Sequence, residues 1–413
     1  MTGMSSLSQQ RNVVVACFLG WTLDAFDFFI MIFVLSDIAK EFGTGITSVT
    51  WAITLTLGLR AVGAILFGRL ADHYGRKPIL MLNVLTFSLF ELASGFAPTL
   101  TAFLILRAGF GIAMGGEWGI GASLTMESIP SRWRGTVSGI LQCGYPCGYL
   151  LAAMLYWLAY PYLGWRGMFI VGASPALLIL YIRSKIDESP DWLIQRRTKP
   201  PVNIFVVAKQ RLPLFLYAIL IMFAINTFSH SSQDLYPNAF LKVQHGLSSQ
   251  TVSTIAIVYS FGAIFGCLTA GTLSQRFGRR RTIVITSLGS ILVIPVWAFS
   301  SDPVWLAVGA FFMQFMVQGC FGVVPAHLNE LSPPEARGTF PGFTYQFGNL
   351  LAAGNATVQS MIADHMNHDY SVALAGGVGL GAIVVALLIG FGIEARDAKM
   401  GTELASPGHR PEG

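Results

Sequence analysis

A row of polar side chains interrupts an apolar segment that runs from residue 212 to about residue 237. Its members are spaced so that, on an α-helix, they lie within about 100° of one another. They are Asn226, His230, Gln233 and Asp234. Such groups cost several kcal/mol inside hydrocarbon unless they face a partner or water. An imidazole and a carboxylate can exchange a proton, and amides can hydrogen-bond, so this row predicts a site for a polar or charged ligand.

Ionisable residues also lie deep inside other apolar segments. Asp24 and Asp27 are three residues apart, which places both carboxylates on one face of a helix. Arg60 precedes Asp72 by twelve residues, which is about 18 Å along a helix and therefore close to mid-membrane. A guanidinium at that depth can clamp a carboxylate through two hydrogen bonds. The alternative for these acids and for Arg60 is a structural ion pair, and the sequence leaves it open.

Three more buried polar residues complete the candidate set. Glu117 lies in the apolar run 100–126 and is a third acid that could hold a proton. Gln346 and Asn349 lie in the run 340–362 and could donate hydrogen bonds to carboxylate or hydroxyl oxygens. Packing between helices explains these two amides equally well.

The composition predicts that these residues are positioned by membrane-spanning helices. Of 413 residues, 53% are hydrophobic and 11% charged, whereas soluble domains carry about 25% charge. Apolar runs of about 20 residues, each long enough to cross a hydrocarbon core, recur along the chain. Twelve are expected, at 13–36, 49–69, 79–97, 100–126, 136–159, 166–183, 213–237, 250–273, 282–300, 303–327, 340–362 and 370–394. The predicted class is an all-α integral membrane protein.

The basic residues predict the orientation of these helices. With the N-terminus in the cytoplasm, all but five of the 26 Lys and Arg residues fall in cytoplasmic segments. Both termini are then cytoplasmic, in a multi-pass protein of the cell inner (plasma) membrane. The net charge of +5 reflects this topology and attraction to anionic lipid. Nucleic-acid binding is not indicated, because the basic residues are spread over many short loops.

The chain contains an internal repeat with an offset of 203 residues. Residues 68–77 match residues 271–280, and residues 127–136 match residues 330–339 at the same offset. Two six-helix bundles with the same orientation are therefore expected around a central cavity. The predicted boundaries are 1–183 for the N-terminal bundle, 184–211 for a cytoplasmic linker, 212–394 for the C-terminal bundle and 395–413 for a cytoplasmic tail. The repeat maps Asp27 onto His230, so these two are expected on opposite walls of the cavity.

The repeated loop carries a family resemblance. Its first copy, Gly-x-x-x-Asp-x-x-Gly-Arg-Lys at 68–77, resembles the signature of the major facilitator superfamily, as do its echo and the Arg-x-Gly-x-Gly pattern that begins at Arg107. The resemblance implies a carrier whose signature loops latch the cytoplasmic side when it faces outward. The implied gating residues are Gly68, Asp72, Gly75, Arg76 and Arg279. Gln275 stands where the first copy has Asp72, so the stronger latch is expected in the first half.

A narrower resemblance involves the polar row. Asn226, Ser229, His230, Ser232, Gln233 and Asp234 match in turn the pattern of lactate and pyruvate permeases of the sialate:proton symporter group. Asn238 replaces a Thr of that pattern. The resemblance implies proton-coupled symport of a small monocarboxylate. The alternatives are symport of sialic acid or another larger acid anion, and a carrier fold that acts as a nutrient sensor.

The resemblance and the residue types together suggest a role for each polar group. Substrate binding is expected from Arg60, Asn226, His230, Gln233, Gln346 and Asn349. Proton coupling is expected from Asp27, Asp234, Glu117 and Asp24. The expected partners are a small organic acid anion, a proton and membrane lipid. The proton gradient replaces any cofactor, and the expected functional unit is a monomer.

Other chemistry is not indicated by the sequence. No phosphate-binding loop and no nucleophile–base arrangement can be recognised, so an enzyme is not expected. All five cysteines lie in predicted helices and indicate no disulfide framework; Cys143 and Cys147, one turn apart, are expected to be packing residues. The polar run 364–369 contains two His and two Asp residues but is best explained as a solvated turn, and no metal site is expected.

Overall fold

The computed structural model describes residues 7–198, 204–367, 369–396, 398 and 400, and these residues form helices and connecting turns without a β-strand. The first half contains α1 (Leu7–Phe33), α2 (Leu35–Glu41), α3 (Ile46–Tyr74), α4 (Arg76–Gly95), α5 (Leu100–Ser128), α6 (Arg134–Gln142), α7 (Gly144–Gly172) and α8 (Leu178–Lys185). Two short helices, α9 (Pro190–Thr198) and α10 (Ile204–Gln210), follow. The second half contains α11 (Leu212–Gln233), a π-helix (Tyr236–Gln244), α12 (Ser249–Phe277), α13 (Arg279–Phe299), α14 (Pro303–Leu331), α15 (Phe340–Ala352), α16 (Asn355–His365) and α17 (Tyr370–Gly390).

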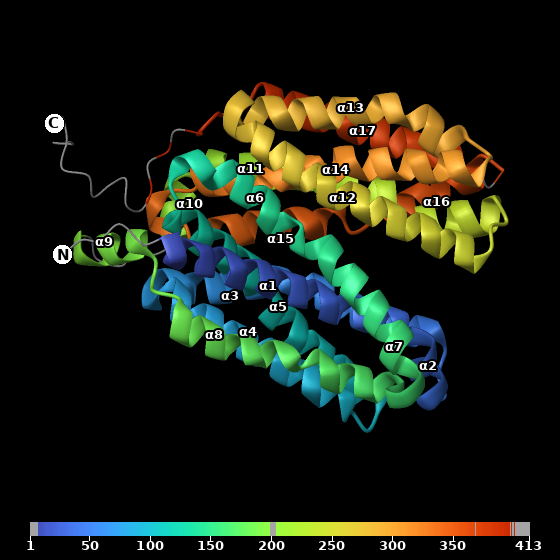
Figure 1. The fold of residues 1–413 in the computed structure, drawn as a ribbon, viewed down its shortest axis with the longest axis horizontal. Coiled ribbons are helices and arrows are strands. Elements are labelled where there is room, and N and C mark those ends of the chain that lie inside the picture. Colours follow the sequence, from blue (N-terminus) through green and yellow to red (C-terminus); the bar gives the residue numbers. More distant parts are fainter. Residues whose placement is uncertain (1–6, 199–203, 368, 397, 399, 401–413) are drawn as a thin grey trace.

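Ten helical runs among the described residues are long and apolar enough to span a membrane. One of them, the 55-residue run Ser131–Lys185, makes two passes: Gly164 adopts non-helical angles within α7, and Figure 1 shows the chain turning back between α7 and α8. A further pass is split into α15 and α16 around Ala353 and Gly354, so neither piece alone reaches spanning length. The expected all-α membrane fold is therefore confirmed, with one predicted span broken in two.

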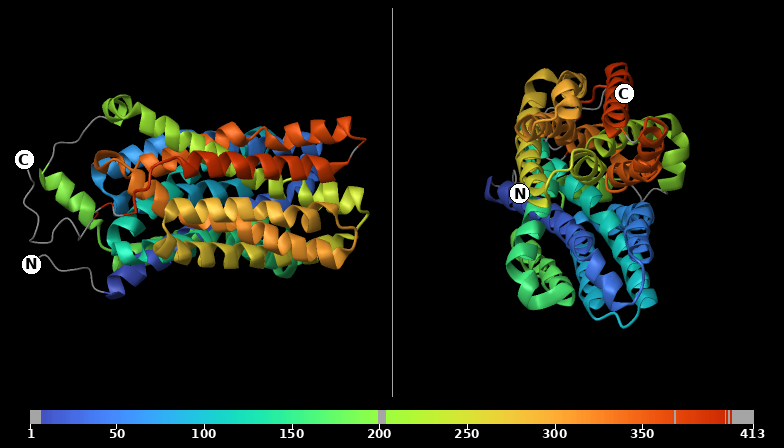
Figure 2. Two further views of the ribbon diagram at one scale, coloured as in Figure 1. Left: turned by 90° about the horizontal axis from the view of Figure 1, so that it is seen from above. Right: turned by 90° about the vertical axis from the view of Figure 1, so that its right-hand side faces the viewer.

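The helices form two bundles, one from each half of the chain. In Figure 1 most helices of the first half, in blue to green, lie below those of the second half, in yellow-green to red, and α6 lies beside α12. Figure 2 shows the same helices side by side along their length. Contacts between the halves join α12 to α6 and α7, α14 to α6, and α3 to α15. A site between the bundles can therefore take side chains from both halves.

The sequence repeat is matched by repeated local structure. Gly75 ends α3 with a φ of 113°, and Gly278 ends α12 with a φ of 96°. Residues with a Cβ rarely adopt such angles, so glycine permits the sharp connection to the next helix in each half. The end of the molecule that carries these two glycines is called the loop-motif end below.

Glycines also bring pairs of helices into close contact within each bundle. A Cβ added to Gly63 of α3 would lie 1.8 Å from the carbonyl oxygen of Ile112 in α5. At the same offset of 203, a Cβ added to Gly266 of α12 would lie 2.1 Å from the carbonyl oxygen of Phe315 in α14. Small residues drive such packing in membranes, where lipid is as apolar as the helix surface. One turn further along α5, Gly115 packs in the same way against the backbone of Arg60 and fixes the position of that residue.

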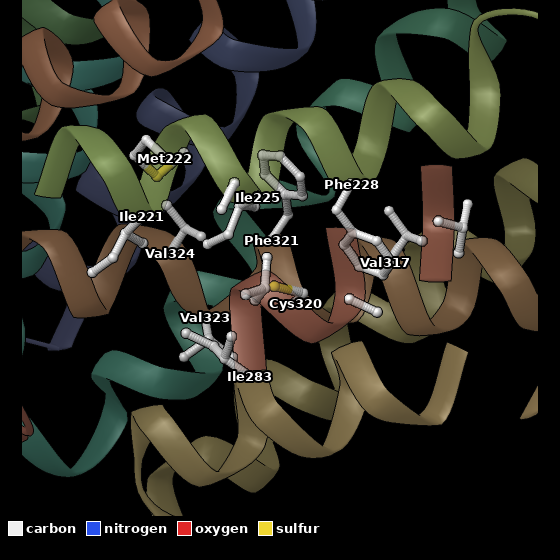
Figure 3. Packing of buried hydrophobic residues seen from close by; sticks show 14 of the residues in the cluster. Ile221, Met222, Ile225, Phe228, Ile283, Val317, Cys320, Phe321, Val323 and Val324 are labelled. Carbon is white, nitrogen blue, oxygen red and sulfur yellow. The ribbon is translucent and has the colours of Figure 1, made fainter. Parts of the chain in front are cut away.

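Apolar side chains fill the interior of each bundle. Figure 3 shows the core of the second half, where residues of α11, α13 and α14 interlock. Phe228, Phe321 and Ile283 are among its completely or almost completely buried members. This packed core holds α11 in place, so the polar row on that helix has a fixed orientation.

Candidate functional site

His230 and Asp234 form the centre of the polar row on α11. The Nδ1 atom of His230 lies 3.0 Å from Oδ2 of Asp234, and its Nε2 atom lies 2.9 Å from Oδ1 of Asn349 on α15. Acceptors at both ring nitrogens suit the doubly protonated imidazole, in which both nitrogens donate. The side chains of His230 and Asp234 are 25% and 32% exposed, so a ligand from solution can reach them.

The other amides of the candidate set differ in how fully they are satisfied. Gln233 donates to Oγ of Ser229 at 3.2 Å. Asn226 and Gln346 are buried, and within the described part of the chain the Asn226 Nδ2 atom and both amide atoms of Gln346 have no hydrogen-bond partner. Buried polar atoms normally find partners, so these amides have hydrogen bonds available for a ligand.

A cluster of one base and two acids lies in the first half. Arg60 of α3 donates from Nη2 to Oδ2 of Asp24 of α1 at 3.1 Å, and both side chains are buried. The contact uses one guanidinium nitrogen and one carboxylate oxygen. Among the described residues, Nε of Arg60 and Oδ1 of Asp24 have no partner. The pair is thus held by a single hydrogen bond rather than by a bidentate clamp.

Glu117 of α5 completes this cluster. It faces Gly20 of α1, where an added Cβ would lie 2.3 Å from Oε1 of Glu117. The carboxyl group is completely buried within electrostatic range of Asp24 and Arg60, and neither of its oxygens has a hydrogen-bond partner among the described residues. An ionised carboxylate is very costly in such surroundings. The cluster therefore holds two acids and one base, and one of the acids can carry a proton.

Asp27 does not occupy the predicted position opposite His230. It is completely buried inside the first bundle, where its carboxylate lies against Gly172 of α7 and beside Glu91 of α4. Glu91 in turn accepts a hydrogen bond from Arg107 at 2.8 Å. The prediction of facing residues was wrong because the repeat specifies equivalent positions but not their neighbours.

Asp27 and His230 have different neighbours because the second half has no counterpart of the Glu91–Arg107 ion pair. Ile294 and Ala310 stand at the repeat positions of Glu91 and Arg107. Because these positions are apolar, His230 contacts Asn349 and Asp234 instead.

Aromatic residues connect the two polar groups. Tyr145 lies within electrostatic range of Arg60 and Asp24 in the first half and of Asp234 in the second. Its ring stacks on Trp21 with centroids 5.8 Å apart. Tyr145 is therefore close to charged groups of both halves.

A second aromatic pair crosses from one half to the other. Trp118 of α5 stacks on Tyr345 of α15 with a centroid distance of 4.3 Å. Sequence reasoning missed these rings, because aromatic residues are common in membrane helices and nothing in their spacing separates a site from lipid contact. Only the position of Trp118 directly after Glu117 hinted at its location.

Two of the predicted gating residues, Asp72 and Gly68, contact the second half at the loop-motif end. Asp72 accepts hydrogen bonds from the backbone nitrogen of Gly338 at 2.8 Å and from Oγ1 of Thr339 at 2.6 Å, and it pairs with Arg76 at 3.1 Å. Gly68 packs against the backbone of Thr339, with an added Cβ 2.8 Å from its Cα atom. The bonds reach the start of α15, where partial positive charge at a helix N-terminus favours a carboxylate.

The second copy of the loop makes the equivalent contact with less charge. Gln275 accepts a hydrogen bond from the backbone nitrogen of Gly135 at 3.0 Å, close to the start of α6. Arg279 pairs with Glu330 at 2.8 Å, as Arg76 pairs with Glu127 at 3.1 Å in the first half. Both loops thus connect the halves, but only the first does so through a carboxylate.

The connecting segment contributes to the same end of the molecule. The indole nitrogen of Trp192 on α9 donates to the carbonyl oxygen of Asp72 at 2.9 Å. Asp191 of the same helix pairs with Arg337 of the second half. The helix α9 therefore contacts both halves beside the signature loop.

The predicted solvated turn at 364–369 is described except for His368, which lies outside the described residues. Within the part of the chain that the structure covers, no group of three or more His, Cys, Asp or Glu residues could hold a metal ion.

Two pseudo-symmetric helical bundles with ionisable groups between them define a multi-pass membrane transporter. The chain belongs to the Major Facilitator Superfamily, whose family model matches residues 17–236 and 235–405. The solved proton:xylose symporter XylE has the same fold, with a TM-score of 0.80 at 18% identity over 96% of this chain and 99% of that chain. The protein is accordingly a secondary transporter rather than an enzyme, and carriers of this superfamily need no cofactor.

Several relatives are described as transporters of organic acids or related compounds. A probable 4-methylmuconolactone transporter of Cupriavidus pinatubonensis is 30% identical over 93% of this chain and 90% of that protein. The sialic acid transporter NanX of Escherichia coli is 26% identical over 95% of this chain and 96% of its own length. A carboxylic acid transporter protein homolog of Saccharomyces cerevisiae is 28% identical over 86% of this chain, which spans 62% of the yeast protein.

Proposed function

We propose that this protein is a proton-coupled symporter of a small monocarboxylate of the lactate and pyruvate type, working by alternating access. The observation that carries the proposal is the Arg60–Asp24–Glu117 cluster, where a single hydrogen bond holds Arg60 and a buried carboxyl group has no partner among the described residues. The names of the organic-acid relatives support an acid as substrate. The polar row on α11 supports a small one, because its pattern resembles that of lactate and pyruvate permeases.

A substrate carboxylate would compete with Asp24 for Arg60. The guanidinium has five N–H donors and donates one hydrogen bond to Asp24. A bidentate bond to the substrate would be stronger than this single contact. Gln346, whose amide is unsatisfied among the described residues, and His230 with Asn349 on the other bundle would bind the remaining polar atoms of the substrate. Asn226 and Gln233 lie on the same row and would complete this part of the site.

Displacement of Asp24 from Arg60 would couple the substrate to a proton. Asp24 and Glu117 would then be two buried carboxyl groups without a cation of their own, and two such groups in one dry site cannot both stay ionised. A proton shared between them removes the repulsion. Asp27 beside Glu91, and Asp234 beside His230, are further positions at which the carrier could hold the coupled proton.

The stoichiometry of one proton per monoanion follows from the charge balance. A lactate-type acid carries one negative charge at neutral pH, so transport with one proton moves no net charge across the membrane. The membrane potential would then neither drive nor oppose uptake, and the proton gradient alone would concentrate the acid.

The positive-inside pattern supports a cytoplasmic location for the loop-motif end and both termini of a carrier in the inner or plasma membrane of a cell. The hydrogen bonds of Asp72 and Gln275 close that end. The partial exposure of His230 and Asp234 then corresponds to an outward-facing carrier. One chain supplies both halves of the site, so a monomer is the expected functional unit.

Proteoliposome uptake of labelled lactate, with and without an inward proton gradient, tests the proposal. Accumulation that depends on the gradient and is competed by pyruvate supports it. Competition by sialic acid but not by pyruvate would indicate that the substrate is a larger acid anion. The similarity to NanX favours this alternative. Binding of lactate without any uptake would indicate a nutrient sensor instead.

Variants of arginine separate a role in binding from a role in folding. Arg60→Gln should weaken lactate binding by at least tenfold, because the bidentate contact is worth more than about 1.4 kcal/mol. Arg166→Gln is the matched control, since Arg166 is partly exposed and pairs with Glu41 away from the site. Equal affinity of the Arg60 variant and the unchanged protein would remove Arg60 from the binding site.

A further inference from the structure

Helices α6 and α12, from different halves, approach each other along a row of small residues. A Cβ added to Gly135 would lie 2.6 Å from the carbonyl oxygen of Gly271. One turn along α6, a Cβ added to Gly139 would lie 2.4 Å from the carbonyl oxygen of Cys267. These distances leave no room for larger side chains, so the two backbones are held close together at the interface between the bundles.

Two cysteines, one on each helix, lie at the end of this row. Cys143 follows Gly139 by one turn, and its Sγ atom donates to the carbonyl oxygen of Ile264 on α12 at 3.4 Å. Cys267 lies one turn along α12 from Ile264, the residue that the Cys143 thiol contacts, and it donates to the carbonyl oxygen of Gln318 at 3.1 Å. Both are free thiols and both are buried. The close backbone approach therefore brings one thiol from each half of the carrier together.

We propose that Cys143 and Cys267 form a reversible oxidation site, and that a disulfide between them locks the two halves together in the conformation described here. A disulfide needs Cα atoms about 4.4–6.8 Å apart, which the glycine row favours by holding α6 against α12. A carrier that works by alternating access must part its halves at this interface, so a covalent bond there stops transport. The loss of transport rests on the proposed function, whereas formation of the bond requires only that the two halves part and close again.

Movement of the carrier explains how buried thiols could react. Burial keeps a thiol protonated and unreactive, but parting of the halves would expose both cysteines to water. Hydrogen peroxide would then oxidise one thiol to a sulfenic acid and release one water. When the halves close, the second thiol would attack the sulfenic sulfur and expel its oxygen as a second water. The two thiols lose two electrons and one peroxide gains them, and a dithiol reductant reverses the reaction.

A cleavable linker detects this bond without knowledge of the substrate. A protease site is inserted between α9 and α10 of the full-length protein, which is reconstituted, treated with peroxide and cleaved. The expected result is one band for the joined halves on a non-reducing gel and two bands after dithiothreitol. Mass spectrometry should identify the linked peptides that contain Cys143 and Cys267.

Single substitutions assign the bond and its effect. Cys143→Ser and Cys267→Ser should each leave two bands after peroxide. Cys320→Ser is the matched control, because Cys320 is a buried thiol on α14, the helix whose Gln318 accepts a hydrogen bond from Cys267, and it should still give one band. Cys147→Ser should behave as the control does. Two bands from the unchanged protein, or a loss of the joined band only in the Cys147 variant, would overturn the assignment.

Transport measured on the same samples tests the locked state. Peroxide should abolish lactate uptake by the unchanged protein, and dithiothreitol should restore it. Uptake that persists while the halves are fully cross-linked would refute the lock. If lactate is not carried, the gel still reports on the thiol pair, so this failure is distinguishable from failure of the proposed function.

Discussion

Substitution of Asp72 should open the loop-motif end. In Asp72→Ala, two hydrogen bonds between the halves are lost, one from Gly338 and one from Thr339. Hydrogen bonds to a charged group contribute about 1.5–3 kcal/mol each. The contribution of the second loop through Gln275 remains. The closed conformation should therefore lose about 3–6 kcal/mol relative to the open one, which changes the equilibrium at least a hundredfold.

Asp72→Asn should produce a smaller effect. The amide oxygen can still accept from Gly338, but the charge is lost and the contact with Thr339 is weakened, as in the second loop, where Gln275 accepts one hydrogen bond from the other half. The expected loss is about 1.5–3 kcal/mol, so the equilibrium should shift roughly 10–100-fold.

Alkylation of the native cysteines measures this shift. Cys143 and Cys267 are buried in the closed conformation, so N-ethylmaleimide should react only when the halves part. The alkylation rate should rise with the open fraction, most in Asp72→Ala and less in Asp72→Asn. Asp302→Asn is the matched control, because Asp302 also accepts two backbone hydrogen bonds but only within its own half, at the start of α14. Equal rates in Asp72→Ala and the control would refute the latch.

Three further predictions concern packing, coupling and pH. Gly115→Ala places a methyl group 2.0 Å from the carbonyl oxygen of Arg60. Overpacking of this kind costs typically about 1–3 kcal/mol, so the melting temperature in detergent should fall. The control Gly58→Ala, with open space around its Cβ, should melt as the unchanged protein does. Glu117→Gln keeps the shape of the side chain but removes its titration, so lactate exchange should persist while accumulation driven by a proton gradient falls at least tenfold; full accumulation would exclude Glu117 as the coupling acid. Although desolvation acts in the opposite direction, hydrogen bonds from Arg166 and Trp165 lower the pKa of Glu41. The ionised Glu41 should thus stabilise the fold above its pKa in the unfolded chain, about 4.3, and this stabilisation should be lost as the pH falls through its lower pKa in the folded protein. The melting temperatures of the unchanged protein and Glu41→Gln should therefore converge in acid and differ above that pH.

The architecture was predictable because long apolar runs and a repeated loop are explicit in the sequence. Membrane helices must satisfy their own backbone, so each run of sufficient length specifies a helix. The split between α15 and α16 was not predicted, because a break around Gly354 changes neither the length nor the polarity of the run. Cys143 was interpreted as a packing residue, and its neighbour Cys267 lies 124 positions away, so no local pattern could indicate the pair.

The candidate site was predictable in its members but not in its pairings. Arg60 and Asp24 were recognised from their depth, yet their hydrogen bond depends on how α1 rotates against α3. The expected pair of Asp27 and His230 was taken from symmetry alone. A buried carboxyl group is drawn to the nearest charge, and the sequence does not show that Glu91 and Arg107 lie beside Asp27.

The two halves have kept the same scaffold but not the same charges, and this difference supports a division of roles. The glycines of the helix contacts and the arginine–glutamate pairs of the loops recur at an offset of 203. The buried cluster does not recur: Thr227, Ala263 and Cys320 stand at the repeat positions of Asp24, Arg60 and Glu117. A proton exchanged by these carboxyl groups would therefore belong to the first half, while the second half presents hydrogen-bonding groups such as Asn349. A substrate that contacts both halves alters the charges of the first half while it hydrogen-bonds to the second. The proposed coupling requires that substrate binding and proton binding depend on each other in this way.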